Sequence, residues 1–204
     1  MLDVLQKRRL TSFDGTDLCY YTAGSGPAVV LANGLGGPVA SYRHVLAELG
    51  PEYQILSWDY RGLYGSGRPN DHRAVSMDHH IRDMEMLMAA EGIDEAIVVG
   101  WSMGVQVGFE FYRRHPDQVA GMVMLCGVAG APFSTVPGGP LAGSLISPLM
   151  QLGKRNARTL QGLSRRVGKW QGLVPLMQKA GFVAGSLDMD VFRDIVEDFA
   201  AMEP

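Results

Sequence analysis

The chain has 204 residues, of which 47% are hydrophobic and 19% charged, as is typical of one globular domain with a substantial core. The formal net charge of −3 gives no electrostatic reason to expect nucleic acid or an anionic membrane as a partner. Cys19 and Cys126 lie in apolar segments and predict buried free thiols in a reducing, cytoplasmic compartment. Prolines interrupt the uncharged stretch 118–153, so we expect no integral membrane segment.

Strands and helices alternate along the first two thirds of the sequence. Runs of apolar or alternating residues between turn signals predict strands at 8–13, 17–22, 28–32, 54–58, 97–99 and 119–126. Apolar residues at helical spacing predict helices at 39–49, 77–88 and 103–114. Asp14-Gly15 predicts a tight turn between the first two strands, and Ser76 is placed to cap a helix. This order predicts an α/β fold with a mainly parallel sheet and helices on both faces.

The most informative stretch is Gly100-Trp101-Ser102-Met103-Gly104, which has the pattern Gly-x-Ser-x-Gly. It follows a predicted strand and precedes a predicted helix. In that setting the serine occupies a strained turn with its hydroxyl projecting from the sheet, as a nucleophile requires. The alternative interpretation is a Gly-Ser turn without chemistry. The loops 33–38 and 59–69 end neighbouring strands and are expected at the same sheet edge.

Three motifs in order give the sequence a specific resemblance. They are the glycine-rich loop 33–38, the turn Asp59-Tyr60-Arg61-Gly62 through Ser66, and the serine pentapeptide 100–104. Over residues 8–130 the chain resembles the N-terminal part of α/β-hydrolases of the esterase and lipase type. Asn33 stands where that family most often has histidine, and Tyr64 where it usually has glycine. Asp59 and Arg61 are interpreted as structural residues that brace their loop.

The resemblance implies carboxylic ester hydrolysis of a small-molecule acyl substrate. Ser102 would be the nucleophile, and the backbone N–H groups of Leu35 and Met103 would form the oxyanion hole. Family members that act on epoxides or haloalkanes carry an aspartate in place of this serine, so Ser102 counts against those reactions. We find no metal or nucleotide motif, and we expect no cofactor.

The base and the acid of a catalytic triad are missing from the sequence. In this family the order along the chain is serine, acid, histidine. After Ser102 the only histidine is His115, about 18–20 Å away along a helix that rises about 1.5 Å per residue. We therefore expect an incomplete or inactive enzyme in this chain alone. A non-catalytic ligand-binding protein of the same fold is the alternative function.

The remaining residues resemble a helical cap. We expect a core at 1–132 and a cap or lid segment at 133–204, without the last two strands of the family's sheet. The cap segment is basic between residues 134 and 187 and acidic from 188 to 203. The sequence thus resembles a truncated hydrolase, in which the apolar strand 119–126 would form an open sheet edge. Such an edge invites self-association.

Overall fold

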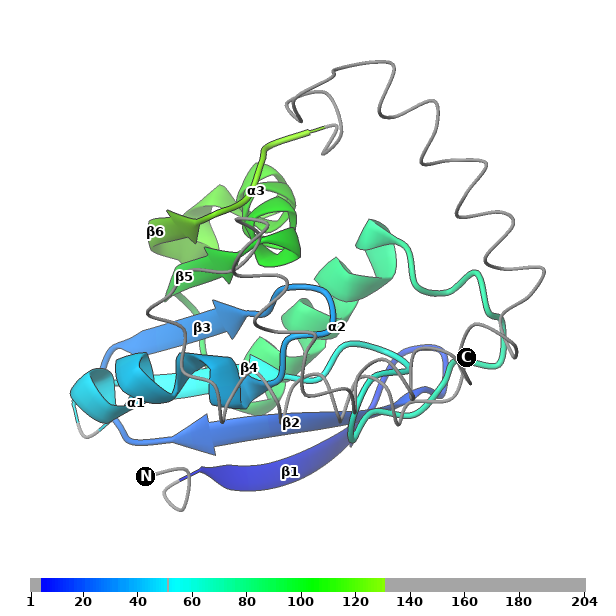
Figure 1. The fold of residues 1–204 in the computed structure, drawn as a ribbon, viewed down its shortest axis with the longest axis horizontal. Coiled ribbons are helices and arrows are strands. Elements are labelled where there is room, and N and C mark those ends of the chain that lie inside the picture. The colour runs from blue at the N-terminus through cyan, green and yellow to red at the C-terminus, as the bar shows by residue number, and fades with distance from the viewer. Residues whose placement is uncertain (1–4, 51, 131–204) are drawn as a thin grey trace, which may run out of the picture. The chain divides into compact units, whose positions relative to one another are not determined.

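A computed structural model of the protein describes residues 5–50 and 52–130, which form a six-stranded sheet (Figure 1). The strands are β1 (Gln6–Thr11), β2 (Asp17–Ala23), β3 (Ala28–Ala32), β4 (Gln54–Trp58), β5 (Ala96–Trp101) and β6 (Val119–Leu125). Their order in space is β1-β2-β4-β3-β5-β6. The first two pairings are antiparallel, and the pairings among β4, β3, β5 and β6 are parallel. The predicted α/β fold with a mainly parallel sheet is confirmed.

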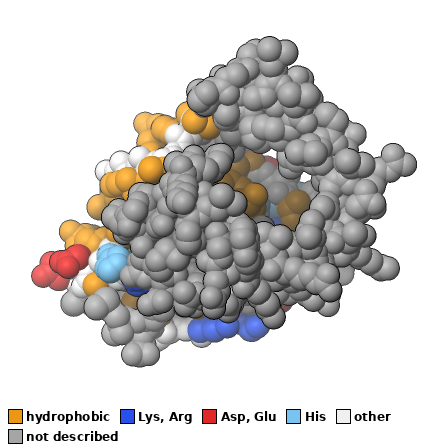
Figure 2. Space-filling model, viewed as in Figure 1, with side chains coloured by type: hydrophobic (Ala, Val, Ile, Leu, Met, Phe, Trp, Pro, Cys, Tyr) orange, Lys and Arg blue, Asp and Glu red, His pale blue; other side chains and the backbone are white. Residues whose placement is uncertain are grey.

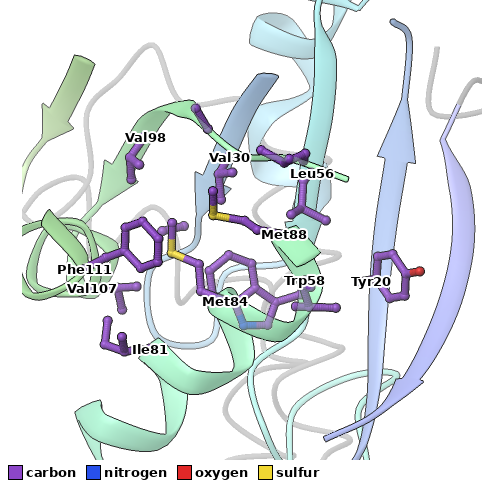
Figure 3. Packing of buried hydrophobic residues seen from close by; sticks show 14 of the residues in the cluster. Tyr20, Val30, Leu56, Trp58, Ile81, Met84, Met88, Val98, Val107 and Phe111 are labelled. Carbon is purple, nitrogen blue, oxygen red and sulfur yellow. The ribbon is translucent and has the colours of Figure 1, made fainter. Parts of the chain in front are cut away.

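Helices pack on both faces of this sheet because successive strand residues point to opposite sides. The helical elements are a 3-10 turn (Val39–Tyr42), α1 (Arg43–Leu49), α2 (Met77–Ala90), α3 (Met103–Arg114) and a short 3-10 turn (Pro116–Gln118). Val29 and Leu31 of β3 pack in one core cluster with Leu46 of α1. Val30, between them in the sequence, joins the opposite cluster with α2 and α3. Figure 3 shows this second core, in which methionines of α2 reach toward the strands.

Three local predictions differ from the structure. The predicted tight turn at Asp14-Gly15 is present, because the Gly15 N–H donates to the Ser12 carbonyl at 2.9 Å. The first strand, however, ends at Thr11 rather than at residue 13, so the hairpin loop spans 12–16. The Asp14 carboxylate accepts the Thr16 N–H at 3.1 Å, and this side-chain contact stabilises the wider loop. Ser76 precedes α2, but its hydroxyl pairs with His79 Nδ1 at 2.8 Å and caps no backbone group. The helix predicted at 39–49 divides into the 3-10 turn and α1.

The two cysteines differ in environment. Cys19 on β2 is buried, as predicted, whereas Cys126 is exposed, so the prediction of two buried thiols is wrong for Cys126. Cys126 follows β6, the outermost of the six described strands on its side, where an apolar sequence does not ensure burial. Val123 and Leu125 of the same strand are 47% and 41% exposed. Figure 2 shows hydrophobic side chains gathered on the side where Figure 1 places β6. Self-association at this edge stays a prediction.

The predicted cap at 133–204 lies outside the described residues. The predicted absence of the last two strands of the family's sheet is therefore not tested. The division of the chain at residue 132 therefore stays a prediction. Within residues 5–50 and 52–130, no helix has the length and apolar character needed to cross a membrane.

Candidate active site

Ser102 occupies a strained turn between β5 and α3. Its φ of 54° and ψ of −111° lie outside the regions that residues with a Cβ usually adopt. The Ser102 N–H donates to the Leu125 carbonyl of β6 at 3.0 Å, and the Ser102 carbonyl accepts the Val105 N–H at 3.1 Å. These bonds hold the turn on both sides, while the Ser102 residue stays exposed to solvent. The sharp turn predicted for Gly-x-Ser-x-Gly is present.

The flanking glycines allow α3 to approach the sheet closely. A Cβ on Gly104 would stand 1.9 Å from the Ala32 carbonyl oxygen at the end of β3. A Cβ on Gly100 would stand 2.5 Å from the Gly104 carbonyl oxygen. Both obstacles are backbone atoms, which cannot move aside as a side chain can. The start of α3 therefore lies against the end of β3, and this contact carries Ser102 to the edge of the sheet.

The loop after β3 reaches the same place. A Cβ on Gly34 would stand 3.3 Å from the Ser102 Cβ, so the two backbones are close neighbours. Residues 34–37 form a turn closed by the Gly37 N–H, which donates to the Gly34 carbonyl at 2.9 Å. Leu35 follows Gly34 in this turn and is 69% exposed. The structure thus brings together Ser102, Met103 and the segment that contains Leu35, and the roles predicted for these residues stay predictions.

The ring of Trp101 packs against the turn 34–37. Cβ atoms on Gly34 and Gly37 would stand 3.0 and 2.6 Å from carbons of the Trp101 ring. The turn therefore rests directly on the indole. Sequence reasoning did not assign this role to Trp101. The only feature of the sequence that could have indicated it is the position of Trp101 immediately before the serine. The glycines that its ring contacts lie more than sixty residues earlier in the chain.

Two buried tyrosines hold the carbonyl groups that lead into the turn. The Tyr42 hydroxyl donates to the Ala32 carbonyl at 2.8 Å, and the Tyr60 hydroxyl donates to the Asn33 carbonyl at 2.7 Å. Burial raises the pKa of both phenols, so they stay protonated donors at physiological pH. Asn33 itself is buried, and its Nδ2 donates to the Trp58 carbonyl at 2.9 Å. The backbone before the candidate oxyanion hole is thereby fixed by side chains that the sequence did not reveal.

Arg61 is a structural residue, as predicted. Its fully buried guanidinium contacts Asp83 of α2 through two bonds of 2.5 and 2.6 Å, and it also pairs with Asp14 of the hairpin loop. Burial alone would raise the pKa of Asp14, but the hydrogen bonds from Arg61 and Thr16, together with the charge of Arg61, outweigh it and hold the pKa at about 2. These contacts tie the 59–69 loop to α2 and to the first hairpin.

Asp59 is also structural. One of its carboxylate oxygens accepts the Tyr21 hydroxyl at 2.9 Å and the Gly65 N–H at 3.0 Å. Burial raises the pKa of this carboxyl group. The Ser66 hydroxyl donates to the Asp59 carbonyl at 2.7 Å and closes the loop. The motif from Asp59 to Ser66 therefore shapes a loop rather than presenting reactive groups.

All five histidines of the chain lie within the described residues. His115 ends α3, at the opposite end from Ser102, and its Nε2 lies 2.7 Å from the Glu85 carboxylate. His79 contacts Ser76, and Arg43 donates to His44 at 3.2 Å. Among the hydrogen bonds described for residues 5–50 and 52–130, none joins a histidine to Ser102. That no histidine of the chain is the base stays a prediction.

Because His80 is buried, we expect the free energy of unfolding to depend on pH. It is 6% exposed on α2, packs 4.7 Å from the Tyr60 ring, and burial lowers its pKa from 6.5 to about 4. Between these two values the unfolded chain takes up a proton that the folded protein does not, so the free energy of unfolding falls as pH falls. We expect wild type to lose about 2 kcal/mol more than His80→Leu between pH 7 and pH 5. Urea unfolding at both pH values measures this, and equal losses would contradict it.

The fold and the strained serine turn define a class of protein. A mainly parallel sheet with helices on both faces, and a serine on a strand-to-helix turn at its edge, is the α/β-hydrolase arrangement. A family model described as alpha/beta hydrolase fold matches residues 27–181, and the chain belongs to this family. The match includes the turn 34–37, the 59–69 loop and Ser102.

Individual relatives match over part of their length. The chain is 32% identical over 109 residues to the uncharacterized hydrolase YraK of Bacillus subtilis, covering 53% of this chain and 40% of that protein. It is 30% identical over 115 residues to a putative carbamate hydrolase, RutD, of Azorhizobium caulinodans, covering 56% and 43%. A solved α/β hydrolase from Novosphingobium aromaticivorans has a TM-score of 0.56 and 25% identity, covering 59% and 44%. The chain thus spans less than half the length of these relatives.

Proposed function

We propose that this chain supplies the nucleophile and the oxyanion hole of a hydrolase that cleaves carboxylic esters of small molecules. One observation carries the proposal: Ser102 lies exposed at φ 54° beside the backbone of the 34–37 turn. A serine in this strained conformation has a cost of about 1–3 kcal/mol, which persists where function uses it. The 34–37 turn lies beside Ser102 and can supply a backbone N–H to an oxyanion formed there, which is a function that would maintain the strained conformation.

The proposed reaction is acyl transfer in two steps. The Ser102 oxygen attacks the ester carbonyl carbon, and the electron pair of the carbonyl moves onto its oxygen. The Leu35 and Met103 N–H groups donate to that oxyanion, and each such donor is worth about 3 kcal/mol. The protonated base returns its proton to the departing alkoxide, so that the alcohol leaves as the carbonyl reforms. Water, giving its proton to the same base, then attacks the acyl-serine and releases the carboxylic acid and the Ser102 hydroxyl. The base that accepts the serine proton is proposed to lie outside the described residues.

The identity of residue 102 favours esters over other substrates of this fold. Family members that open epoxides or displace halide use a carboxylate nucleophile at this position, and this chain has a hydroxyl. A serine oxygen attacks carbonyl carbon and forms an acyl intermediate. One relative is described as a putative carbamate hydrolase, and a carbamate, like an ester, contains a carbonyl carbon. These points support acyl transfer at Ser102.

Labelling with a fluorophosphonate tests the proposal in the full-length protein. We expect one covalent adduct, mapped by peptide mass spectrometry to Ser102 and lost in Ser102→Ala. Saturable binding of an ester by both proteins, with no adduct in either, would instead support the non-catalytic alternative. An adduct on another residue would overturn the assignment of Ser102.

A further inference from the structure

Tyr64 is conspicuous because its backbone conformation disfavours a side chain. Its φ is 46°, in the left-handed region where glycine is usual, and the α/β-hydrolase resemblance also leads one to expect glycine at this position. The side chain is half-buried, and its hydroxyl donates to the Gly36 carbonyl. A large residue in this conformation therefore connects the 59–69 loop to the 34–37 turn.

The contact can be followed through two peptide units to the candidate oxyanion hole. Peptide bonds in this turn are trans, so the carbonyl and the N–H of each unit point in opposite directions. Holding the Gly36 carbonyl therefore also aims the Gly37 N–H. That N–H donates to the Gly34 carbonyl at 2.9 Å, which in turn aims the Leu35 N–H of the same peptide unit away from Gly37. Each bond in such a series polarises the next.

We propose that Tyr64 is a positioning residue for the oxyanion hole. Its hydroxyl fixes the peptide unit 36–37, and this unit fixes the orientation of the Leu35 N–H beside Ser102. The inference rests on the proposed function, since it assigns the purpose of the contact to transition-state stabilisation. It adds a side-chain hydroxyl, supplied by a neighbouring loop, to a site otherwise made of backbone donors.

The turn is held on both sides, and Tyr64 is the partner best suited to a test. Tyr42 and Tyr60 hold the carbonyls of Ala32 and Asn33, but both are almost fully buried in the two cores. Replacing either by phenylalanine would leave a buried main-chain carbonyl without its donor, which destabilises the core as well as the turn. Tyr64 is only half-buried, so Tyr64→Phe removes the hydroxyl and keeps the ring.

The test compares Tyr64→Phe with a matched control in the full-length protein. Tyr20→Phe is the control, because the Tyr20 hydroxyl donates to Glu91 at 2.7 Å near the end of α2, and its loss leaves the turn intact. For ester turnover we expect Tyr64→Phe to lower kcat about tenfold with KM nearly unchanged, less than the roughly 100-fold cost of losing an oxyanion donor. We expect Tyr20→Phe to keep the wild-type kcat.

Amide hydrogen exchange gives a readout that does not need turnover. We expect exchange in the segment 34–37 to become at least several-fold faster in Tyr64→Phe and to stay unchanged in Tyr20→Phe. Unchanged exchange in Tyr64→Phe, or unchanged kcat in an enzyme whose Ser102 is labelled, would overturn the inference. An unlabelled Ser102 in wild type would overturn the proposed function first, and the two failures are thus distinguished.

Discussion

Replacing Ser102 by alanine is expected to lower kcat/KM for ester hydrolysis by about 10⁴- to 10⁶-fold in the full-length protein. The variant keeps the backbone donors but has no oxygen to form the acyl intermediate. What survives comes from the oxyanion hole and from binding. Because the Ser102 residue is exposed and alanine carries the same Cβ, the free energy of unfolding is expected to change by less than about 0.5 kcal/mol. Steady-state kinetics and urea unfolding measure both quantities.

Ser25→Ala is the matched control for this variant. Ser25 is an exposed serine in the loop between β2 and β3, and it has no place in the proposed chemistry. We expect its kinetics to equal those of wild type. If Ser102→Ala hydrolysed the ester at a rate within tenfold of wild type, Ser102 would not be the nucleophile, even though the chain has the α/β-hydrolase fold.

Replacing Arg61 by methionine is expected to give the largest loss of stability. Asp83 is fully buried and forms two bonds with Arg61, so the variant leaves a buried carboxylate without its main partner. Breaking a buried ion pair from one side costs about 3–5 kcal/mol, because the remaining charge keeps its desolvation penalty. Urea unfolding of the full-length protein measures the change.

Two further variants make the Arg61 result specific. Arg113→Met removes an exposed arginine whose pair with Glu110 lies in solvent, and little change in stability is expected. The double variant Arg61→Met and Asp83→Leu removes both buried charges and should recover part of the loss. If Arg61→Met costs no more than Arg113→Met, the buried network does not brace the loop as described.

The sequence predicted the features of the site that depend on neighbours in the chain. Gly100, Ser102 and Gly104 lie within five consecutive residues, and their spacing predicts the sharp bend because few other residues fit there. The alternation of strands and helices similarly predicted the order of layers. Family membership followed from three such local patterns.

Features that depend on distant partners were missed. The ring of Trp101 supports a turn that lies more than sixty residues earlier, and Tyr64 reaches a carbonyl on another loop. Arg61 was correctly interpreted as structural, yet its partner on α2 was not identified. In the first two cases the contact exists because parallel strands bring separate segments to one edge, and in the third it joins the 59–69 loop to a helix. No local pattern in the sequence predicts these contacts.

The errors have physical causes as well. Ser76 has the residue type of a helix cap, but the neighbouring imidazole of His79 competes for its hydroxyl. Cys126 lies in an apolar run, but it follows a strand that is outermost among those described. Residue type gives a preference, and the partners available in the fold decide the outcome.

A crystal structure of the full-length protein after reaction with a fluorophosphonate tests the central claim most directly. The adduct mimics the tetrahedral intermediate at the serine. We predict phosphorus bonded to the Ser102 oxygen, with the phosphoryl oxygen about 2.7–3.1 Å from the backbone nitrogens of both Leu35 and Met103. A phosphoryl oxygen that points into solvent, with neither nitrogen within hydrogen-bonding distance, would contradict the account.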